Sequence, residues 1–230
     1  MPNIENNITA VQRRLQQAAR DAGRSPEDVL LLAVSKTRTS AQVRRAVDAG
    51  VQSFGENYLQ EAADKIDQLQ DCNLDWHFIG PLQSNKTRQA AEHFDWVHSV
   101  DRMKIAQRLS DQRPENKPLL NICLQINLDN EVSKSGYSPE QALQSASAIA
   151  QLPNLRLRGL MAIPRARPDI EGQRRAFARF RALQDQINSL LDNSQKLDTL
   201  SMGMSADMEA AICEGATIVR VGTDIFGPRD

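Results

Sequence analysis

The amino-acid sequence predicts an α/β fold, a closed (β/α)8 TIM barrel built as a single domain over residues 1–230. Eight short apolar or β-branched segments, typical of buried parallel strands, recur along the chain. A helical pattern separates each segment from the next, and the 230 residues come near the roughly 250 that are usual for this barrel. A doubly wound open sheet would show the same alternation, but the count of eight favours a closed barrel.

The expected elements follow one another with short connections. Residues 4–22 carry Ile4, Ile8, Val11 and Leu15 at helical spacing, which predicts an amphipathic helix ahead of the first strand. Strands are expected at residues 30–35, 51–54, 75–79, 96–100, 119–127, 155–163, 197–201 and 217–221. Helices are expected at residues 40–49, 58–69, 84–93, 101–109, from 138 onward, 177–190 and 205–215. The residues expected to cap helix N-termini are Ser40, Asp101, Ser138 and Ser205.

The C-terminal end of the chain departs from this pattern. After the eighth expected strand only residues 222–230 remain, which are too few for a full eighth helix. We therefore expect the helix at residues 4–22 to fill that gap in the outer ring. The sequence shows no linker, low-complexity segment or charge block, which supports a single domain.

Composition narrows the classes of function. A net charge of -1, a pI near 6.3 and an aromatic content of 4% argue against nucleic-acid binding. The sequence has neither a secretory leader nor an apolar run of the ~20 residues that cross a bilayer, so we expect no membrane partner. The cysteines are isolated, which indicates a reducing compartment and a cytoplasmic protein; they are Cys72, Cys123 and Cys213. No apolar patch for dimerisation is evident, so we expect a monomer.

A lysine at the end of the first expected strand is the leading candidate for chemistry. Alternation along residues 30–35 places Leu32, Val34 and Lys36 on one face, so the ammonium group must emerge where the strand ends. A lysine that is partly desolvated there loses its proton more readily, and Schiff-base chemistry requires this. The alternative is an ordinary surface lysine.

The loops after the seventh and eighth expected strands resemble a phosphate site, which this fold commonly builds there. Ser201 and Gly203 precede an expected helix, and Gly222 and Thr223 follow the adjoining strand. Glycine lets backbone N–H groups approach an anion, and hydroxyl groups donate hydrogen bonds to it. The alternative is that these residues only form turns and a helix cap.

Arg220 is a second charge on an apolar strand. Its guanidinium cannot lose its proton in a protein and so needs an acceptor, either a carboxylate such as Glu56 or Asp207 or an acceptor on a ligand. Together with Lys36 and the phosphate loops, Arg220 suggests pyridoxal 5'-phosphate, with the arginine at the pyridine nitrogen. A guanidinium there keeps this nitrogen unprotonated and weakens the ring as an electron sink.

Seven motifs in order resemble those of a known family. They are AVSKT (33–37), FGENY (54–58), WHFIGPLQSNK (76–86), SKSG (133–136), RGLM (158–161), SMGMSADME (201–209) and RVGT (220–223). Over essentially its whole length the chain resembles the pyridoxal phosphate homeostasis protein family, the YggS/PROSC type, which is related to the barrel domain of alanine racemase.

This resemblance implies roles for individual residues. Lys36 is expected to carry pyridoxal phosphate as a Schiff base, with Arg220 at the pyridine nitrogen. The expected phosphate contacts are Ser201, Gly222 and Thr223, and the residues expected near the ring are Asn57, His77 and Met161. Arg38, Lys86 and Lys134 either form a basic rim that attracts the anionic cofactor or are solvated surface charges.

We predict a carrier of the cofactor rather than an enzyme. By resemblance, a racemase on this barrel has a second β domain and a tyrosine from a partner subunit, and we expect neither here; the only tyrosines are Tyr58 and Tyr137. The protein is then expected to store pyridoxal phosphate or to deliver it to apo-enzymes. Two alternatives stay open: a pyridoxal phosphate-dependent enzyme that acts on amino acids, with Lys36 as base, and a Schiff-base aldolase that acts on a sugar phosphate.

Overall fold

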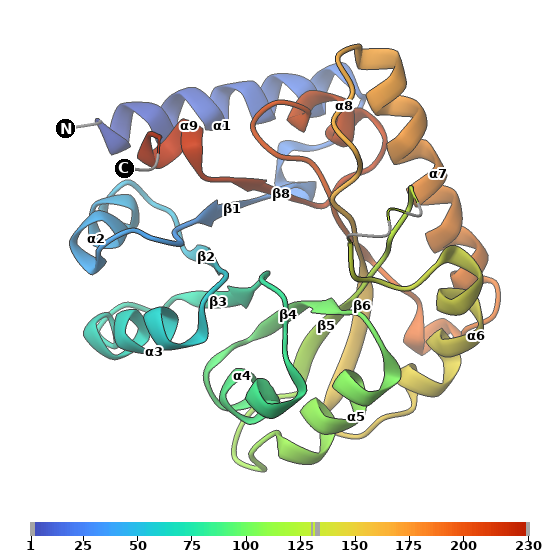
Figure 1. The fold of residues 1–230 in the computed structure, drawn as a ribbon. Coiled ribbons are helices and arrows are strands. Elements are labelled where there is room, and N and C mark those ends of the chain that lie inside the picture. Colours follow the sequence, from blue (N-terminus) through green and yellow to red (C-terminus); the bar gives the residue numbers. More distant parts are fainter. Residues whose placement is uncertain (1–2, 130, 132–133, 229–230) are drawn as a thin grey trace.

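The computed structural model describes residues 3–129, 131 and 134–228. Ser133, part of one of the seven motifs, lies outside the described residues. Parallel strands form a closed barrel in the order β1 to β8, and β8 returns to pair with β1 (Figure 1). The strands are β1 (Leu30–Val34), β2 (Ser53–Glu56), β3 (Asp75–Phe78), β4 (Trp96–Val100), β5 (Leu120–Gln125), β6 (Leu155–Met161), β7 (Thr199–Ser201) and β8 (Ile218–Val221). The predicted fold class is confirmed.

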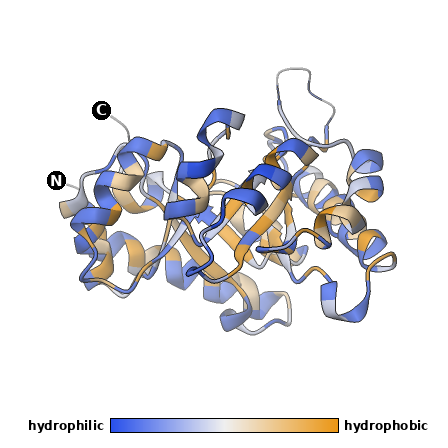
Figure 2. Cartoon of the chain, turned by 90° about the horizontal axis from the view of Figure 1, so that it is seen from below, coloured by the Kyte–Doolittle hydropathy of each residue, from blue (hydrophilic) through white to orange (hydrophobic). Residues whose placement is uncertain are grey.

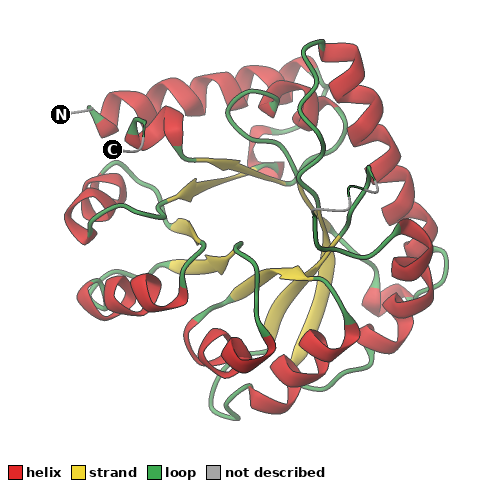
Figure 3. Cartoon of the chain, viewed as in Figure 1, coloured by secondary structure: helices red, strands yellow, loops and turns green. Residues whose placement is uncertain are grey.

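Helices surround the barrel on its outer side (Figure 3). The α-helices are α1 (Ile4–Asp21), α2 (Ser40–Asp48), α3 (Leu59–Gln68), α4 (Thr87–His93), α5 (Met103–Gln112), α6 (Pro139–Ala150), α7 (Ile170–Asn188), α8 (Met208–Cys213) and α9 (Thr223–Phe226). Three short 3-10 helices complete the described elements: η1 (Pro26–Asp28), η2 (Ser84–Lys86) and η3 (Asn193–Gln195). None of the described helices is both long and apolar enough to span a membrane.

The main apolar core lies between the barrel and the helices. Hydrophobic residues gather on the strands and on the inner sides of the helices, whereas hydrophilic residues face outward (Figure 2). On β2 and β3 the aromatic rings of Phe54 and Trp76 meet outside the barrel, with 5.7 Å between their centroids. Because side chains alternate along a strand, the neighbouring His77 points into the barrel.

The N-terminal helix closes the outer ring, as predicted. α1 packs against α8 and against α9, the single helical turn that follows β8. Arg14 of α1 donates hydrogen bonds to Glu209 of α8 at 2.8 Å and to Asp224 of α9 at 2.7 Å. The Asn7 amide donates to the Ile225 carbonyl at 2.9 Å.

Three of the four predicted helix caps are wrong and one is confirmed. Ser138 forms a capping box with Gln141 at the start of α6. At α2 the preceding Thr39 takes the cap, because Gln42 lies at the spacing that lets its side chain bond back to the Thr39 backbone. The other two predicted caps lie before their helices because α5 begins only at Met103 and α8 only at Met208; they are Asp101 and Ser205.

Candidate functional site

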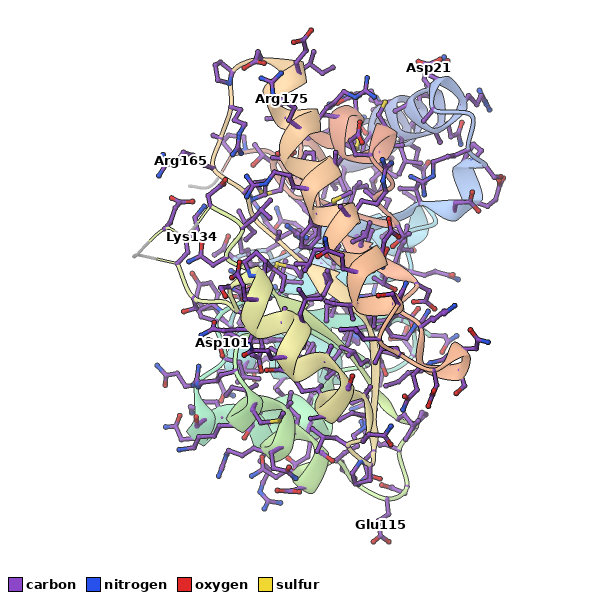
Figure 4. All side chains as sticks on the ribbon, turned by 90° about the vertical axis from the view of Figure 1, so that its right-hand side faces the viewer. Asp21, Asp101, Glu115, Lys134, Arg165 and Arg175 are labelled. Carbon is purple, nitrogen blue, oxygen red and sulfur yellow. The ribbon has the colours of Figure 1, made fainter. Side chains whose placement is uncertain are left out.

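The strands present their carboxyl ends on one side of the barrel, and a cavity of about 270 Å³ lies there. In Figure 4 this side carries Asp101, Lys134 and Arg165, from the loops that follow β4, β5 and β6. Five of the eight predicted cofactor residues line the cavity: Lys36, Asn57, Arg220, Gly222 and Thr223. Predicted residues at the carboxyl ends of β1, β2 and β8 therefore meet at one cavity.

Lys36 lies just beyond β1, half-buried at the cavity wall. Val34 lines the same cavity, as alternation along the strand predicts. The intervening Ser35 is fully buried and faces the other way, toward α3. The side chain of Lys36 therefore reaches the cavity from a backbone that is held on its opposite face.

A buried ion pair lies behind Lys36. The Lys65 ammonium of α3 donates to Glu56 Oε1 at 2.7 Å and to the Ser35 carbonyl at 2.6 Å, and only 3% of Lys65 is exposed. The Ser35 hydroxyl donates to the same Glu56 oxygen at 2.6 Å. Burial raises the pKa of the Glu56 carboxyl, while the Lys65 charge and the hydrogen bonds from Lys65 and Ser35 act in the opposite direction. This pair fixes the residue immediately before Lys36.

The residue immediately after Lys36 is held by the same group of side chains. Thr37 has a φ of 63°, in the left-handed region that β-branched residues rarely adopt. Its N–H donates to Glu61 Oε1 at 2.6 Å, and that oxygen also accepts from Lys65 at 2.6 Å. Lys65 was not among the residues predicted from the sequence; the spacing of Glu61 and Lys65, four residues apart on one helix, was the available signal.

Arg220 of β8 is 4% exposed and uses neither carboxylate that the sequence suggested. Its guanidinium donates to the Ser201 carbonyl at 2.6 Å, the Ser201 hydroxyl at 2.7 Å and the Ala162 carbonyl at 2.8 Å. Glu56 is paired with Lys65 outside the barrel, and Asp207 accepts from the Met204 N–H at 2.7 Å. Burial lowers the pKa of Arg220 to about 10, so the guanidinium remains charged at neutral pH.

A tight backbone approach brings the end of β8 against β1. A Cβ atom on Gly222 would lie 3.2 Å from the Val34 carbonyl oxygen and 3.3 Å from Val34 Cβ, so a larger residue would need Val34 to move. Thr223 follows at the cavity wall, which Ser205 and Ala206 of the loop after the neighbouring β7 also line. Ser205 was predicted to cap a helix and instead lines the cavity, a position that was not predicted.

Three predicted residues do not line the cavity. Ser201, His77 and Met161 are each at most 1% exposed. The Ser201 hydroxyl bonds to Arg220 and lies 2.8 Å from Nδ1 of His98, which the sequence analysis did not single out. His77 Nδ1 lies 2.9 Å from His98 Nε2. Hydrogen bonds thus connect His77 to the cavity through His98, Ser201 and Arg220.

The remaining polar candidates sit at the rim or outside it. The Arg38 guanidinium lines the cavity and donates to the carbonyls of Gly227 and Pro228, both at 2.8 Å. Lys134 donates to the Ile163 carbonyl at 3.0 Å and is ion-paired with Glu131, whereas Lys86 is exposed in η2 and does not line the cavity.

Neither tyrosine lines the cavity that contains Lys36. Tyr58 precedes α3 and is 55% exposed. Tyr137 is buried, and its hydroxyl has no hydrogen-bond partner among the described residues. Burial, together with the charge of Asp101, raises the pKa of Tyr137 to about 12. The described cavity wall therefore offers no phenol opposite the lysine.

Known proteins resemble the chain over its whole length. The family model for the alanine racemase N-terminal domain matches residues 5–230. The pyridoxal phosphate homeostasis protein of Pseudomonas aeruginosa is 60% identical over 230 residues, with 100% of this chain and 97% of the relative covered. The protein of the same name from Escherichia coli is 51% identical over 233 residues, with 100% and 98% covered.

Solved structures agree with these matches. PipY of Synechococcus elongatus, solved without and with PLP bound, is 36% identical and gives TM-scores of 0.87 and 0.84, with 98% of this chain and 100% of PipY covered. Alanine racemase from Corynebacterium glutamicum is 17% identical with a TM-score of 0.72, and the match covers 98% of this chain and 61% of the racemase. The likeness to the racemase shows the fold alone.

The buried ion pair behind Lys36 gives a stability prediction. Replacing Lys65 by Met leaves the Glu56 carboxylate buried without its cation, and we expect the free energy of unfolding to fall by about 3–5 kcal/mol. Adding Glu56→Gln to the Lys65→Met variant removes the unpaired buried charge and should restore part of the lost free energy of unfolding. Urea unfolding of the two single variants and the double variant measures the coupling; additive losses would contradict the pairing.

The buried histidines predict how stability changes with pH. Burial lowers the pKa of His77 to about 3 and that of His98 well below its ordinary range, whereas an unfolded histidine titrates near 6.5. Between pH 6.5 and 3 the unfolded state therefore binds more protons, and stability falls as pH falls. His77→Asn should reduce this slope by about 1.4 kcal/mol per pH unit. Urea unfolding should show the difference below pH 6 and equal slopes above pH 7.5.

Proposed function

We propose a function for this chain from the premise that it belongs to the pyridoxal phosphate homeostasis protein family. The chain binds pyridoxal 5'-phosphate and serves in the homeostasis and supply of that cofactor. The observation that carries the proposal is one cavity lined by the Lys36 amine, the Arg220 guanidinium and the Gly222–Thr223 turn. Relatives named for this role cover essentially the whole chain, and one neighbouring structure contains PLP.

The residues at the cavity fit this cofactor chemically. Lys36 supplies an amine for the aldehyde, and Arg220 supplies a buried cation with three of its five N–H groups engaged by the protein. Gly222 has no Cβ atom, which lets its backbone pass close to Val34 at the cavity wall. The Asn57 side-chain oxygen at the cavity is buried and has no partner among the described residues, so it can accept a hydrogen bond from a ligand.

In the proposed arrangement Lys36 holds the cofactor as a Schiff base, formed from its amine and the cofactor aldehyde with loss of one water. Gly222 and Thr223 bind the phosphate, and Ser205, which lines the same cavity, adds a hydroxyl group. Arg220 meets the pyridine nitrogen. Ser201 contributes through Arg220, because its hydroxyl and carbonyl both accept hydrogen bonds from the guanidinium.

We propose that the protein carries the cofactor and has no dedicated turnover. Pyridoxal phosphate supplies an electron sink for carbanions, and that sink is strong only when the ring nitrogen is protonated. Arg220, with a pKa of about 10, donates a hydrogen bond to this nitrogen without giving up its proton. The described cavity wall also lacks a tyrosine. Apo-enzymes that use pyridoxal phosphate are the proposed recipients, and the carrier is a cytoplasmic monomer.

Replacing Lys36 tests the Schiff base. After incubation with pyridoxal phosphate and gel filtration, the wild-type protein should keep a visible absorbance, and Lys36→Ala should lose it because the amine is gone. Lys86→Ala, at an exposed lysine outside the cavity, should behave as wild type. Borohydride reduction followed by peptide mass spectrometry should locate the cofactor on Lys36. An unchanged absorbance in Lys36→Ala would contradict the assignment, and no absorbance in wild type would favour the aldolase.

The loaded protein also distinguishes a carrier from an amino-acid enzyme. We expect it to restore the activity of an apo-aminotransferase, and Lys36→Ala treated in the same way should restore none. We also expect no exchange of the α-proton of common amino acids in deuterated water, followed by proton NMR. Rapid exchange that depends on Lys36 would instead support the racemase-like alternative.

A further inference from the structure

A chain of polar side chains crosses the interior of the barrel beneath the cavity. TIM-barrel interiors are ordinarily filled with bulky branched apolar residues. Here His77 of β3 and His98 of β4 face Ser201 of β7 and Arg220 of β8, and all four are at most 4% exposed. Because β4 and β8 lie on opposite sides of the ring, the chain spans the barrel (Figure 1).

The hydrogen bonds of this chain follow one another without a break. Arg220 Nη1 lies 2.7 Å from Ser201 Oγ, and Ser201 Oγ lies 2.8 Å from His98 Nδ1. His98 Nε2 then lies 2.9 Å from His77 Nδ1. The His77 ring stacks on the Trp96 ring with 5.2 Å between centroids and 6° between planes. The indole therefore fixes the plane of the last imidazole.

The arginine sets the direction of the whole chain. A guanidinium only donates, so Ser201 Oγ accepts from Arg220 and can donate its own hydrogen to Nδ1 of His98. In that arrangement His98 carries its proton on Nε2, and that N–H donates to Nδ1 of His77. His77 in turn carries its proton on Nε2, an atom with no partner among the described residues.

The opposite direction is less favourable because it leaves more buried polar groups without a hydrogen-bond partner. If Nδ1 of His98 donated to Ser201, the hydroxyl hydrogen of Ser201 would have no acceptor in the chain, and His77 Nε2 would be an unused acceptor. The first direction leaves one buried group without a partner and the reverse leaves two. The two tautomers are therefore linked to each other and to Arg220.

Both histidines are neutral in this arrangement. A charged imidazole would lie in a buried interior that already holds the Arg220 guanidinium, and burial lowers the pKa of both rings. The charge of Arg220 lowers the pKa of His98 further. The chain thus keeps a single positive charge, and that charge is at the cavity.

We propose that His98 and His77 are positioning residues that act on the cofactor through Ser201 and Arg220. By fixing the Ser201 hydroxyl as an acceptor, they hold the guanidinium in one orientation toward the ring nitrogen. Neither histidine touches the cofactor, since neither lines the cavity. This inference rests on the function proposed above and assigns a role to a part of the barrel that the cavity itself does not include.

The first test needs no cofactor. Long-range proton–nitrogen NMR on the ¹⁵N-labelled protein reports which ring nitrogen of each histidine carries the proton. We expect His77 and His98 both to be protonated on Nε2 and to stay so from pH 8 to pH 5. A proton on Nδ1 of His98, or a charged ring at pH 7, would overturn the proposed direction.

The second test compares two variants that each remove one side-chain atom inside the barrel. Ser201→Ala breaks the chain, whereas Cys123→Ala, at a fully buried residue of β5, leaves every hydrogen bond of the chain intact. We expect Ser201→Ala to lose bound pyridoxal phosphate about tenfold faster on dialysis, as for a lost hydrogen bond to a charged group. Cys123→Ala should lose bound pyridoxal phosphate at a rate within about twofold of wild type, a smaller effect than the loss of one such hydrogen bond. Equal retention in the two variants would overturn the proposal.

Substitutions at His98 separate a positioning role from a merely structural one. Gln can accept from Ser201 and donate to His77, whereas Leu can do neither. His98→Gln should retain the cofactor better than His98→Leu at equal melting temperature, and the visible band should move only in His98→Leu. If both variants behave alike, the histidine has no positioning role. A wild-type protein that holds no cofactor would overturn the proposed function, while the tautomers would still decide the direction of the chain.

Discussion

The pairing of β8 with β1 is the constraint on which the site depends. Residues near position 30 and near position 220 become neighbours only when the barrel closes, with Leu30 opposite Ile218 and Ala33 opposite Val221. Because the strands are parallel, their carboxyl ends meet at one edge, and Lys36 then lies beside Gly222 and Arg220. The ion pairs that join α1 to α8 and α9 hold the same seam from outside. The closing of the barrel therefore also brings the residues of the site together.

The fold buries two cations near the site and satisfies them differently. Lys65 is surrounded by two carboxylates and a carbonyl outside the barrel, so its charge is neutralised locally. Among the described residues, Arg220 donates hydrogen bonds to a hydroxyl group and two carbonyl oxygens inside the barrel and to no carboxylate, although the charge of Asp207 also acts on it. The first arrangement holds the backbone around Lys36, and the second keeps a positive charge available to an electron-rich ligand atom.

The periodicity of the sequence predicted the features that depend on residues close together along the chain. Strand and helix periodicity gave the eight strands and the closing helix, and position at a strand end singled out Lys36 and Arg220. The inward direction of Ser201 was not predictable in the same way, because its hydroxyl partners come from β4 and β8. His98 lies in none of the seven motifs. Its proposed role depends on residues of β3, β7 and β8. The late start of α8 depends on the Asp207 contact to the Met204 N–H, which converts an expected cap into a turn at the cavity.

A cofactor carrier, the role proposed for this chain, has to hold its ligand and also release it, and the surroundings of Lys36 fit both needs. The backbone on either side of the lysine is fixed by Glu56, Lys65 and Glu61, so the amine starts from a defined place. The side chain itself is only half-buried, and the cavity opens beside Ile163 and Met204, which are 43% and 38% exposed. Water or an incoming amine can reach the proposed Schiff base in such a setting. An enzyme gains from closing its site around the reacting atoms, whereas an open cavity beside a fixed backbone fits the reversible storage proposed above.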